Sequence, residues 1–281
     1  MDDPARGRTL TTDGPPLIPD GLDATLVLVR HGESTFIVEG RFQGRAESPL
    51  SGTGRRQAAL VAARLAAPQA VPPLPVPSGD PVEIVHSPLG RATETAEAIQ
   101  AAFRSAGAQL PRRADPGFTE IGQGAWEGLH RDEVTARYGA ELAAWRRTPL
   151  TAWAPGGESL TDVAARVRPA LAAILARLAE GQAPGTHDRP QVAGYAAPVP
   201  DHRWSIIVGH DGVFKVTLLT LFDLPLDRFW MWSMDPCAIS VVELRAGRPV
   251  LRAHDLTAHL AGVGDEGAVP TADDRSASGA L

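Results

Sequence analysis

Four basic or imidazole side chains come at or just after apolar stretches of the sequence. Arg30 and His31 directly follow LVLV (26–29), and Arg91 and His210 come soon after two further apolar stretches. A guanidinium group can donate hydrogen bonds to two phosphate oxygens at once, and a neutral imidazole can act as a nucleophile toward phosphorus. These residue types predict a site for a phosphate-like group that one histidine can attack, while the second histidine contacts the transferring oxygens.

Phosphate transfer to a histidine also requires a proton donor. An alkoxide leaving group must gain a proton, and the water that later attacks must lose one. The glycine-rich stretch FTEIGQGAWEG, which is typical of a loop, offers the carboxyl groups of Glu120 and Glu127. The residues themselves leave the choice between these two open.

Short aliphatic runs alternate with longer helical patterns along the chain. This alternation predicts βαβ crossovers, and hence a mainly parallel α/β sheet covered by helices on both faces. Ligands bind beyond the carboxyl ends of the strands in such sheets, where the four side chains would converge. The expected strands are 25–29, 82–86, 205–210 and 239–244, with an edge strand at 250–254. The expected helices are 51–67, a helix with Ser87 as N-cap and Pro88 as first residue, and a helix from Leu160 with a Ser159–Asp162 capping box.

The composition excludes several classes of protein. The chain has 281 residues and a formal net charge of −6, which argues against a nucleic-acid partner. Its one cysteine, Cys237, permits no intramolecular disulfide and no multi-cysteine metal site. No apolar run approaches the roughly 20 residues that span a bilayer, and the N-terminus lacks a secretory pattern. We therefore expect a cytoplasmic protein with no membrane partner; a homodimer is left open.

Pro- and Gly-rich segments predict the domain organisation. Residues 1–22 are expected to form a flexible leader, 23–257 a single domain, and 258–281 a disordered tail. The segments 68–81 and 181–201 are expected to be long surface loops within that domain, because the elements on either side complete one pattern.

Several motifs resemble those of a known family. The stretches LVRHGES, GRFQGRAESPLSGTGRRQA, HSPLGRATETA, TEIGQGAWEG, PGGES and VGHDGV occur in this order between about residue 25 and residue 245. Together they are similar to the histidine phosphatase superfamily, which includes cofactor-dependent phosphoglycerate mutases and many phosphatases. The resemblance implies a three-layer α/β/α sandwich like that of phosphoglycerate mutase, with no metal and no cofactor.

The resemblance also implies roles for individual residues. His31 would be the phosphohistidine nucleophile, and Glu120 the proton donor and then the base. Arg30, Arg91 and His210 would form the phosphate pocket. Additional substrate contacts are expected from Gln43, Gly44 and Asp211.

One residue departs from the family pattern. Family members often have Trp-Asn or Leu-Asn where this chain has Phe36-Ile37, and that Asn normally helps to bind phosphate. Ile37 offers no side-chain hydrogen bond, and losing one such contact costs about 0.5–1.5 kcal/mol. Activity should survive this loss, although the preferred substrate could differ.

The block around Glu120 favours a phosphatase over a mutase. Mutases carry a Glu-Arg-x-Tyr-Gly type of block after a longer insertion. In this chain the segment that precedes TEIGQGAWEG is short, and the block resembles that of the phosphatases. The expected function is a metal-independent phosphomonoester hydrolase that acts on a small phosphorylated metabolite through phosphohistidine. The alternatives are a cofactor-dependent phosphoglycerate mutase and a non-catalytic phospho-ligand-binding protein, which Ile37 would favour.

Overall fold

A computed structural model describes residues 16–180 and 201–263. In this part of the chain, six strands form one sheet in the order β3-β2-β4-β1-β5-β6. The first four of these are parallel, and β5 and β6 continue the sheet in antiparallel pairing. The strands are β1 Ala24–Arg30, β2 Ile84–His86, β3 Arg112–Ala114, β4 Trp204–Gly209, β5 Ile239–Arg245 and β6 Arg248–Leu256. The expected mainly parallel α/β sheet, with an edge strand at its end, is confirmed.

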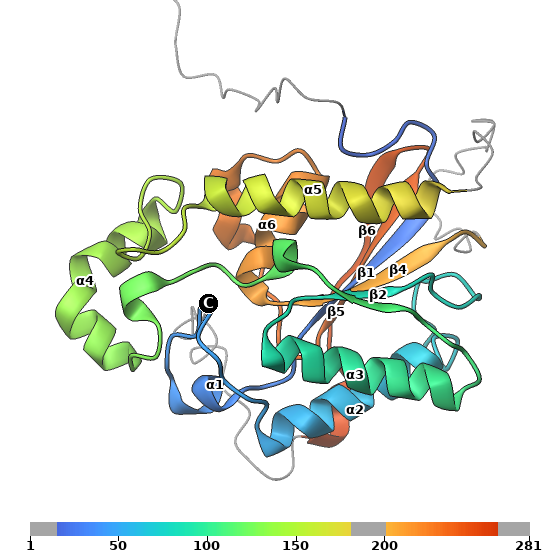
Figure 1. Cartoon of the computed structure of the whole chain (residues 1–281), viewed down its shortest axis with the longest axis horizontal. Helices are drawn as coiled ribbons and strands as arrows, with labels where there is room; N and C mark the ends of the chain where they lie inside the picture. Colours follow the sequence, from blue (N-terminus) through green and yellow to red (C-terminus); the bar gives the residue numbers. More distant parts are fainter. Residues whose placement is uncertain (1–15, 181–200, 264–281) are drawn as a thin grey trace, which may run out of the picture.

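Helices cover both faces of the sheet. Figure 1 shows α2 and α3 on one face, α5 and α6 on the other, and α4 to one side, away from the sheet. This arrangement confirms the three-layer α/β/α architecture. The α-helices are α1 Thr35–Glu39, α2 Gly52–Ala66, α3 Gly90–Ser105, α4 Arg131–Arg147, α5 Leu160–Ala179 and α6 Asp211–Leu221, and the short 3-10 helices are η1 Pro116–Phe118, η2 Gly124–Trp126, η3 Leu226–Met231 and η4 Ala258–Val263.

The strand β1 is buried along its whole length because it lies between two cores. Leu26 and Leu28 pack into the core shared with α5 and α6, whereas Val27 and Val29 pack into the core shared with α2 and α3. Burying each such side chain contributes about 1.5–3 kcal/mol. The apolar run therefore fixes the position of the two residues that end it, Arg30 and His31.

The helix α3 begins later than the sequence pattern predicts. Its N-cap is Leu89 and its first residue is Gly90, so the expected start with Ser87 as N-cap and Pro88 as first residue is wrong by two residues. The Ser87 hydroxyl lies instead 2.7 Å from Nε2 of His210. The same oxygen also accepts the N–H of Leu89 at 3.3 Å, so Ser87 contacts both the start of α3 and the residue after β4.

The ends of the described chain contact the domain. Leu22 is buried, and Leu17 and Ile18 pack against the core, so part of the segment expected as a leader lies on the domain. Residues 258–263 form η4, which packs beside α2. The rest of the predicted leader (1–15) and tail (264–281) lies outside the described residues.

The two expected loops differ in how far the structure describes them. Residues 68–81 contain no helix or strand, as expected, and Leu74 and Val76 from this loop are buried in the core beside α2 and α3. Almost all of the loop expected at 181–201 is outside the described residues. None of the helices in the described ranges is long and apolar enough to cross a membrane.

Candidate active site

His31 lies immediately beyond β1, and its imidazole is held in one tautomer. Nδ1 is 2.6 Å from the Gly32 carbonyl oxygen, which can only accept, so Nδ1 carries the proton and Nε2 keeps its lone pair. Burial, helped by the positive charges of Arg91 and Arg30, lowers the pKa of His31 well below its ordinary value of 6.5. His31 is therefore a neutral imidazole with a nucleophilic nitrogen.

The backbone around His31 is fixed on several sides. The His31 N–H donates to the Gly209 carbonyl at 2.9 Å, and the N–H of Cys237 donates to the carbonyls of Arg30 and His31 at 3.1 and 3.2 Å. A Cβ on Gly32 would lie 2.4 Å from a backbone oxygen of α2, so only glycine fits there. The backbone of His31 is thus held on several sides.

Arg91, in the first turn of α3, is fully buried beside His31. Its Nε donates to His31 Nε2 at 3.2 Å, while Nη1 and Nη2 donate to the carbonyls of Ala46 and Gly44 at 3.0 and 2.8 Å. Burial is the main cause that lowers the pKa of Arg91 to about 10, so it stays protonated at neutral pH. Gly44, expected to contact substrate, thus supplies a carbonyl that orients this cation.

Arg30 is the last residue of β1, and its charge helps to lower the pKa values of His31 and Arg91. Its Nη1 donates to the Met234 carbonyl at 2.5 Å, and its buried Nε has no hydrogen-bond partner among the described residues. Asp211, which was expected to bind substrate, lies behind this arginine. Its Oδ1 accepts from the Met234 N–H at 3.0 Å, and its Oδ2 is 2.6 Å from Nζ of Lys215. In the structure, Asp211 therefore holds the residue whose carbonyl accepts from Arg30.

His210 brings a second imidazole against the first. The ring centroids of His31 and His210 are 4.9 Å apart. Burial, with added repulsion from Arg91 and His31, lowers the pKa of His210 well below 6.5. Nε2 of His210 bonds to the Ser87 hydroxyl, whereas the buried Nδ1 has no partner in the described part of the chain. When Ser87 donates to Nε2, Nδ1 carries a hydrogen that can be donated to a phosphate oxygen.

Sequence reasoning missed this role of Ser87. The residue was interpreted as a helix cap, although it directly follows the expected second strand, as Arg30 and His210 follow theirs. Its position at a strand end was the available signal.

Glu120 lies beside this group and is almost completely buried. Its carboxylate accepts the N–H groups of Ile121 and Val213 at 2.9 Å and of Gly212 at 3.2 Å, the last two at the start of α6. Burial is the largest influence and raises the pKa of Glu120, and the Asp211 charge adds to the rise. A buried carboxyl of this kind can hold a proton at pH values where an exposed glutamate is ionised.

Glu127 has a different environment. Its Oε1 accepts the backbone N–H groups of Gln123 and Arg45 at 2.8 and 3.0 Å, which ties two loops together. Of the two candidate carboxyls, Glu120 is the one that bonds to the helix following His210. The geometry favours Glu120 as the proton donor.

Ile37 lies in α1, and Gln43 lies in the loop that follows this helix. Gln43 is buried, and its Oε1 accepts from the Ser34 hydroxyl at 2.7 Å. The backbone N–H of Ile37 donates to the same hydroxyl at 3.3 Å, so Ser34 also caps α1. Ile37 itself is half-buried and presents only an aliphatic side chain.

The residues at the site do not form a metal-binding set. Across residues 16–180 and 201–263, no three His, Cys, Asp or Glu side chains are grouped so that they could hold a metal ion. The site is instead dominated by guanidinium and imidazole groups, which suit an anion.

Comparison with known proteins agrees with this chemistry. The family model "Histidine phosphatase superfamily (branch 1)" matches residues 26–184 and 191–257. Glucosyl-3-phosphoglycerate phosphatase of Mycobacterium tuberculosis is 33% identical over 202 residues, which cover 72% of this chain and 76% of that protein. The Proteus mirabilis protein named "Probable phosphoglycerate mutase GpmB" is 30% identical over 220 residues, covering 77% and 83%.

A solved structure has the same fold. Mycobacterial glucosyl-3-phosphoglycerate phosphatase in complex with VO3 superimposes with a TM-score of 0.64 at 28% sequence identity, covering 83% of this chain and 99% of that one. The family model, the relatives and the fold agree: the chain belongs to the histidine phosphatase superfamily, branch 1.

Proposed function

We propose that this chain is a metal-independent phosphomonoester hydrolase that acts on a small phosphorylated metabolite through a phosphohistidine intermediate. The observation that carries the proposal is the His31 tautomer: Nδ1 is held by the Gly32 carbonyl, so the lone pair of Nε2 is available beside two arginines. Similarity to phosphatases supports the hydrolytic reaction class.

In the first step, Nε2 of His31 attacks phosphorus and the bond from phosphorus to the ester oxygen breaks. Glu120 gives its proton to that oxygen, so the product leaves as an alcohol. Arg30, Arg91 and His210 hold the three phosphoryl oxygens as charge moves onto them. A phosphate oxygen takes the place of His31 Nε2 as acceptor for Arg91.

In the second step, water attacks the phosphohistidine. Glu120, now ionised, accepts a proton from the water as the bond from phosphorus to Nε2 breaks. Inorganic phosphate leaves, and His31 and Glu120 return to their starting protonation states. One carboxyl group thus serves both steps.

The hydrolysis is tested with a chromogenic aryl phosphate in excess chelator. Wild-type protein should release phosphate and carry an acid-labile phosphoryl group, and His31→Ala should lose both. His202→Gln is the matched control, because His202 lies at the opposite end of β4 from His210. Turnover that persists in His31→Ala, or that requires added metal, would show the proposal to be wrong.

The similarity to a protein named as a phosphoglycerate mutase supports a second candidate. A mutase would use the same residues but exclude water until an acceptor arrives. It would interconvert 3- and 2-phosphoglycerate faster than it releases phosphate. Ile37 leaves a third candidate, a binding-only protein, which would bind phosphate esters without releasing phosphate in either wild type or variant.

A further inference from the structure

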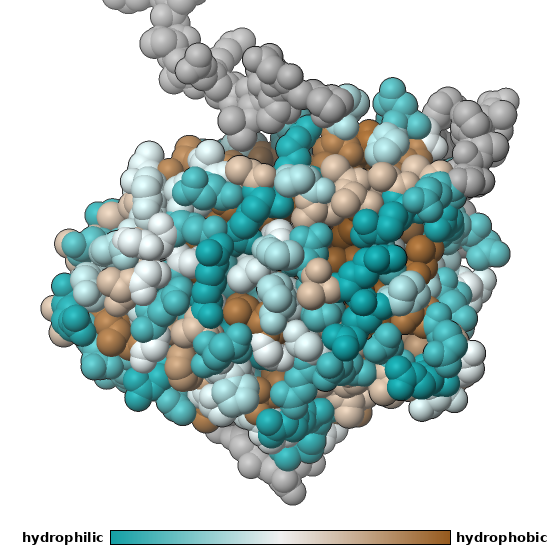
Figure 2. Space-filling view, in the orientation of Figure 1, coloured by the Kyte–Doolittle hydropathy of each residue, from teal (hydrophilic) through white to brown (hydrophobic). Residues whose placement is uncertain are grey.

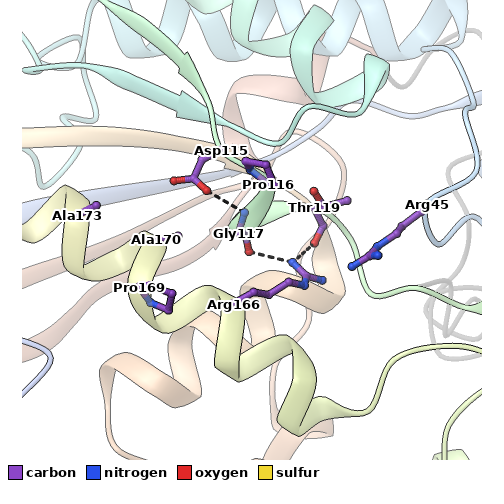
Figure 3. A pocket seen from close by; sticks show the side chains of 9 residues that line it. All are labelled: Arg45, Asp115, Pro116, Gly117, Thr119, Arg166, Pro169, Ala170 and Ala173. Carbon is purple, nitrogen blue, oxygen red and sulfur yellow. Dashed lines mark hydrogen bonds between the residues drawn. The ribbon is translucent and has the colours of Figure 1, made fainter. Parts of the chain in front are cut away.

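Arg166 of α5 donates to three carbonyl groups in the loop that carries Glu120. Its Nη1 donates to the carbonyls of Gly117 and Thr119 at 2.9 and 2.7 Å, and its Nη2 to the carbonyl of Glu120 at 3.1 Å. Figure 3 shows the guanidinium reaching from the helix to Gly117 and Thr119. One planar side chain thus fixes the backbone up to and including Glu120.

Glu158 binds this arginine and also binds the loop on the C-terminal side of Glu120, at Gly122. Its carboxylate receives Nε and Nη2 of Arg166 at 3.1 and 2.9 Å and the Gly122 N–H at 2.9 Å. Its own N–H donates to the Gly122 carbonyl at 2.8 Å. Partial burial opposes ionisation of Glu158, but the Arg166 and Gly122 hydrogen bonds outweigh it and lower the pKa. Glu120 therefore lies between two anchored points.

The loop packs against α5 at Gly117 and buries Phe118 and Ile121 in the hydrophobic core. A Cβ on Gly117 would lie 2.4 Å from Cβ of Ala170, so loop and helix are in close contact there. Beside this contact lies a cleft of about 550 Å³, lined by Arg45, Asp115, Pro116, Gly117, Thr119, Arg166, Pro169, Ala170 and Ala173. Figure 2 shows hydrophilic residues over much of the described surface on one face. Beside this cleft, the hydrogen bonds from Arg166 hold the backbone of the loop.

The side-chain carboxyl group of Glu120 and its backbone carbonyl are held by two different helices. The carboxyl oxygens accept N–H groups from α6, whereas the backbone carbonyl accepts from Arg166 of α5. A small shift of the backbone would therefore turn the carboxyl away from the leaving oxygen. A displacement of about 1 Å is enough to cost roughly 100-fold in rate.

We propose that Arg166, locked by Glu158, is a positioning residue that holds the Glu120 carboxyl where it can protonate the leaving group. The proposal rests on the proposed phosphatase function. Lysine cannot replace the guanidinium here, because an ammonium group cannot direct donors to three carbonyls and one carboxylate in a single plane. In this role Arg166 acts on the reaction through Glu120 and is not itself assigned to bind the phosphoryl group.

The test compares two classes of ester. p-Nitrophenolate leaves without a proton, whereas an alkoxide needs one, so misplacing Glu120 should affect alkyl phosphates selectively. For Arg166→Lys we expect kcat/KM to fall by at least about tenfold on an alkyl phosphate such as phosphoserine, and by only about twofold on p-nitrophenyl phosphate. The matched control is Arg55→Lys, which alters an exposed ion pair with Glu94.

Glu158→Gln tests the same role if Arg166→Lys fails to fold. Thermal unfolding shows whether each variant is folded. Glu158→Gln keeps an acceptor for Gly122 but removes the charge that locks Arg166, and it should show the same selective loss. Equal losses on both esters, or no loss on either, would overturn the positioning role. Failure of the proposed function is distinguished separately, because wild-type protein would then turn over neither ester.

Discussion

At the scale of single residues, burial gives the two reacting groups the protonation states that they need. In water a histidine, with an ordinary pKa of 6.5, holds its proton more tightly than a glutamate, with an ordinary pKa of 4.5. A neutral imidazole beside a protonated carboxyl is then the minor state. Burial lowers the pKa of His31 and raises that of Glu120, so both shifts favour this state.

These shifts predict the pH dependence of kcat/KM. Activity should fall at low pH as His31 gains a proton, and this limb should lie below pH 6.5 because the pKa is lowered. It should fall at high pH as Glu120 loses its proton, above the ordinary range of a glutamate because the pKa is raised. Glu120→Gln should lower kcat/KM on alkyl phosphates by about 100-fold or more and remove the high-pH limb.

The measurement is a pH profile of kcat/KM for the wild-type protein and for Glu120→Gln, with one alkyl phosphate as substrate. Glu127→Gln serves as the comparison, since that carboxyl binds loop N–H groups instead. A high-pH limb that remains in Glu120→Gln but disappears in Glu127→Gln would reverse the assignment.

Residue types in the sequence predicted most of the site but not its supporting contacts. Arg30, His31, Arg91 and His210 could be found because each comes at or soon after the end of an apolar run. Ser87 also follows an apolar run and could have been found by the same reasoning. The Arg166–Glu158 pair could not, because Arg166 bonds to Glu120, which lies 46 positions away in the sequence. Such pairings depend on how the elements pack.

At the scale of elements, the close approach of α2 to the turn after β1 fixes the nucleophile. A Cβ on Gly54, in the first turn of α2, would lie 1.9 Å from the Glu33 carbonyl oxygen, whereas a Cβ on Gly52 would meet nothing within 4 Å. The helix end can approach His31 only because residue 54 has no side chain.

This contact predicts different effects for two alanine substitutions in one helix turn. Gly54→Ala should destabilise the fold by about 1–3 kcal/mol, because the helix and the turn must separate, and it should lower kcat by displacing His31. Gly52→Ala should leave both unchanged or raise the free energy of unfolding slightly. Urea unfolding and steady-state kinetics measure these effects, and equal stabilities for the two variants would contradict the expected clash.

The elements that the sequence did not predict lack a clear periodic pattern. The helix α4 buries only Val134, Leu142 and Trp145 of its 17 residues and is interrupted at Tyr138, so its apolar positions are sparse. The strand β3 has three residues, RRA, whose charge and length carry no strand signal. β3 is fixed by its pairing with β2, whereas α4 begins with a capping box formed by His130 and Glu133.

At the scale of the whole molecule, a mixed sheet holds the site from both sides. The parallel strands β4 and β2 bring His210 and Ser87 to one side of β1. The antiparallel strand β5 lies on the other side, and the residues leading into it include Met234, which holds Arg30, and Cys237, which binds the backbone of Arg30 and His31. The segment between α6 and β5 is therefore part of the support for the phosphate pocket.

The burial of Cys237 has a chemical consequence for the enzyme. The side chain is fully buried, and burial raises the pKa of its thiol, so little thiolate forms and reagents cannot reach it. Iodoacetamide should leave the native protein unlabelled and fully active, and should label one site per chain only after unfolding in urea. Labelling or inactivation of the folded protein, detected by mass spectrometry and phosphate release, would show that the turn beside His31 opens. Because the proposed nucleophile is an imidazole and the one cysteine is buried, this phosphatase should not be inactivated by the thiol oxidation that disables enzymes with a cysteine nucleophile.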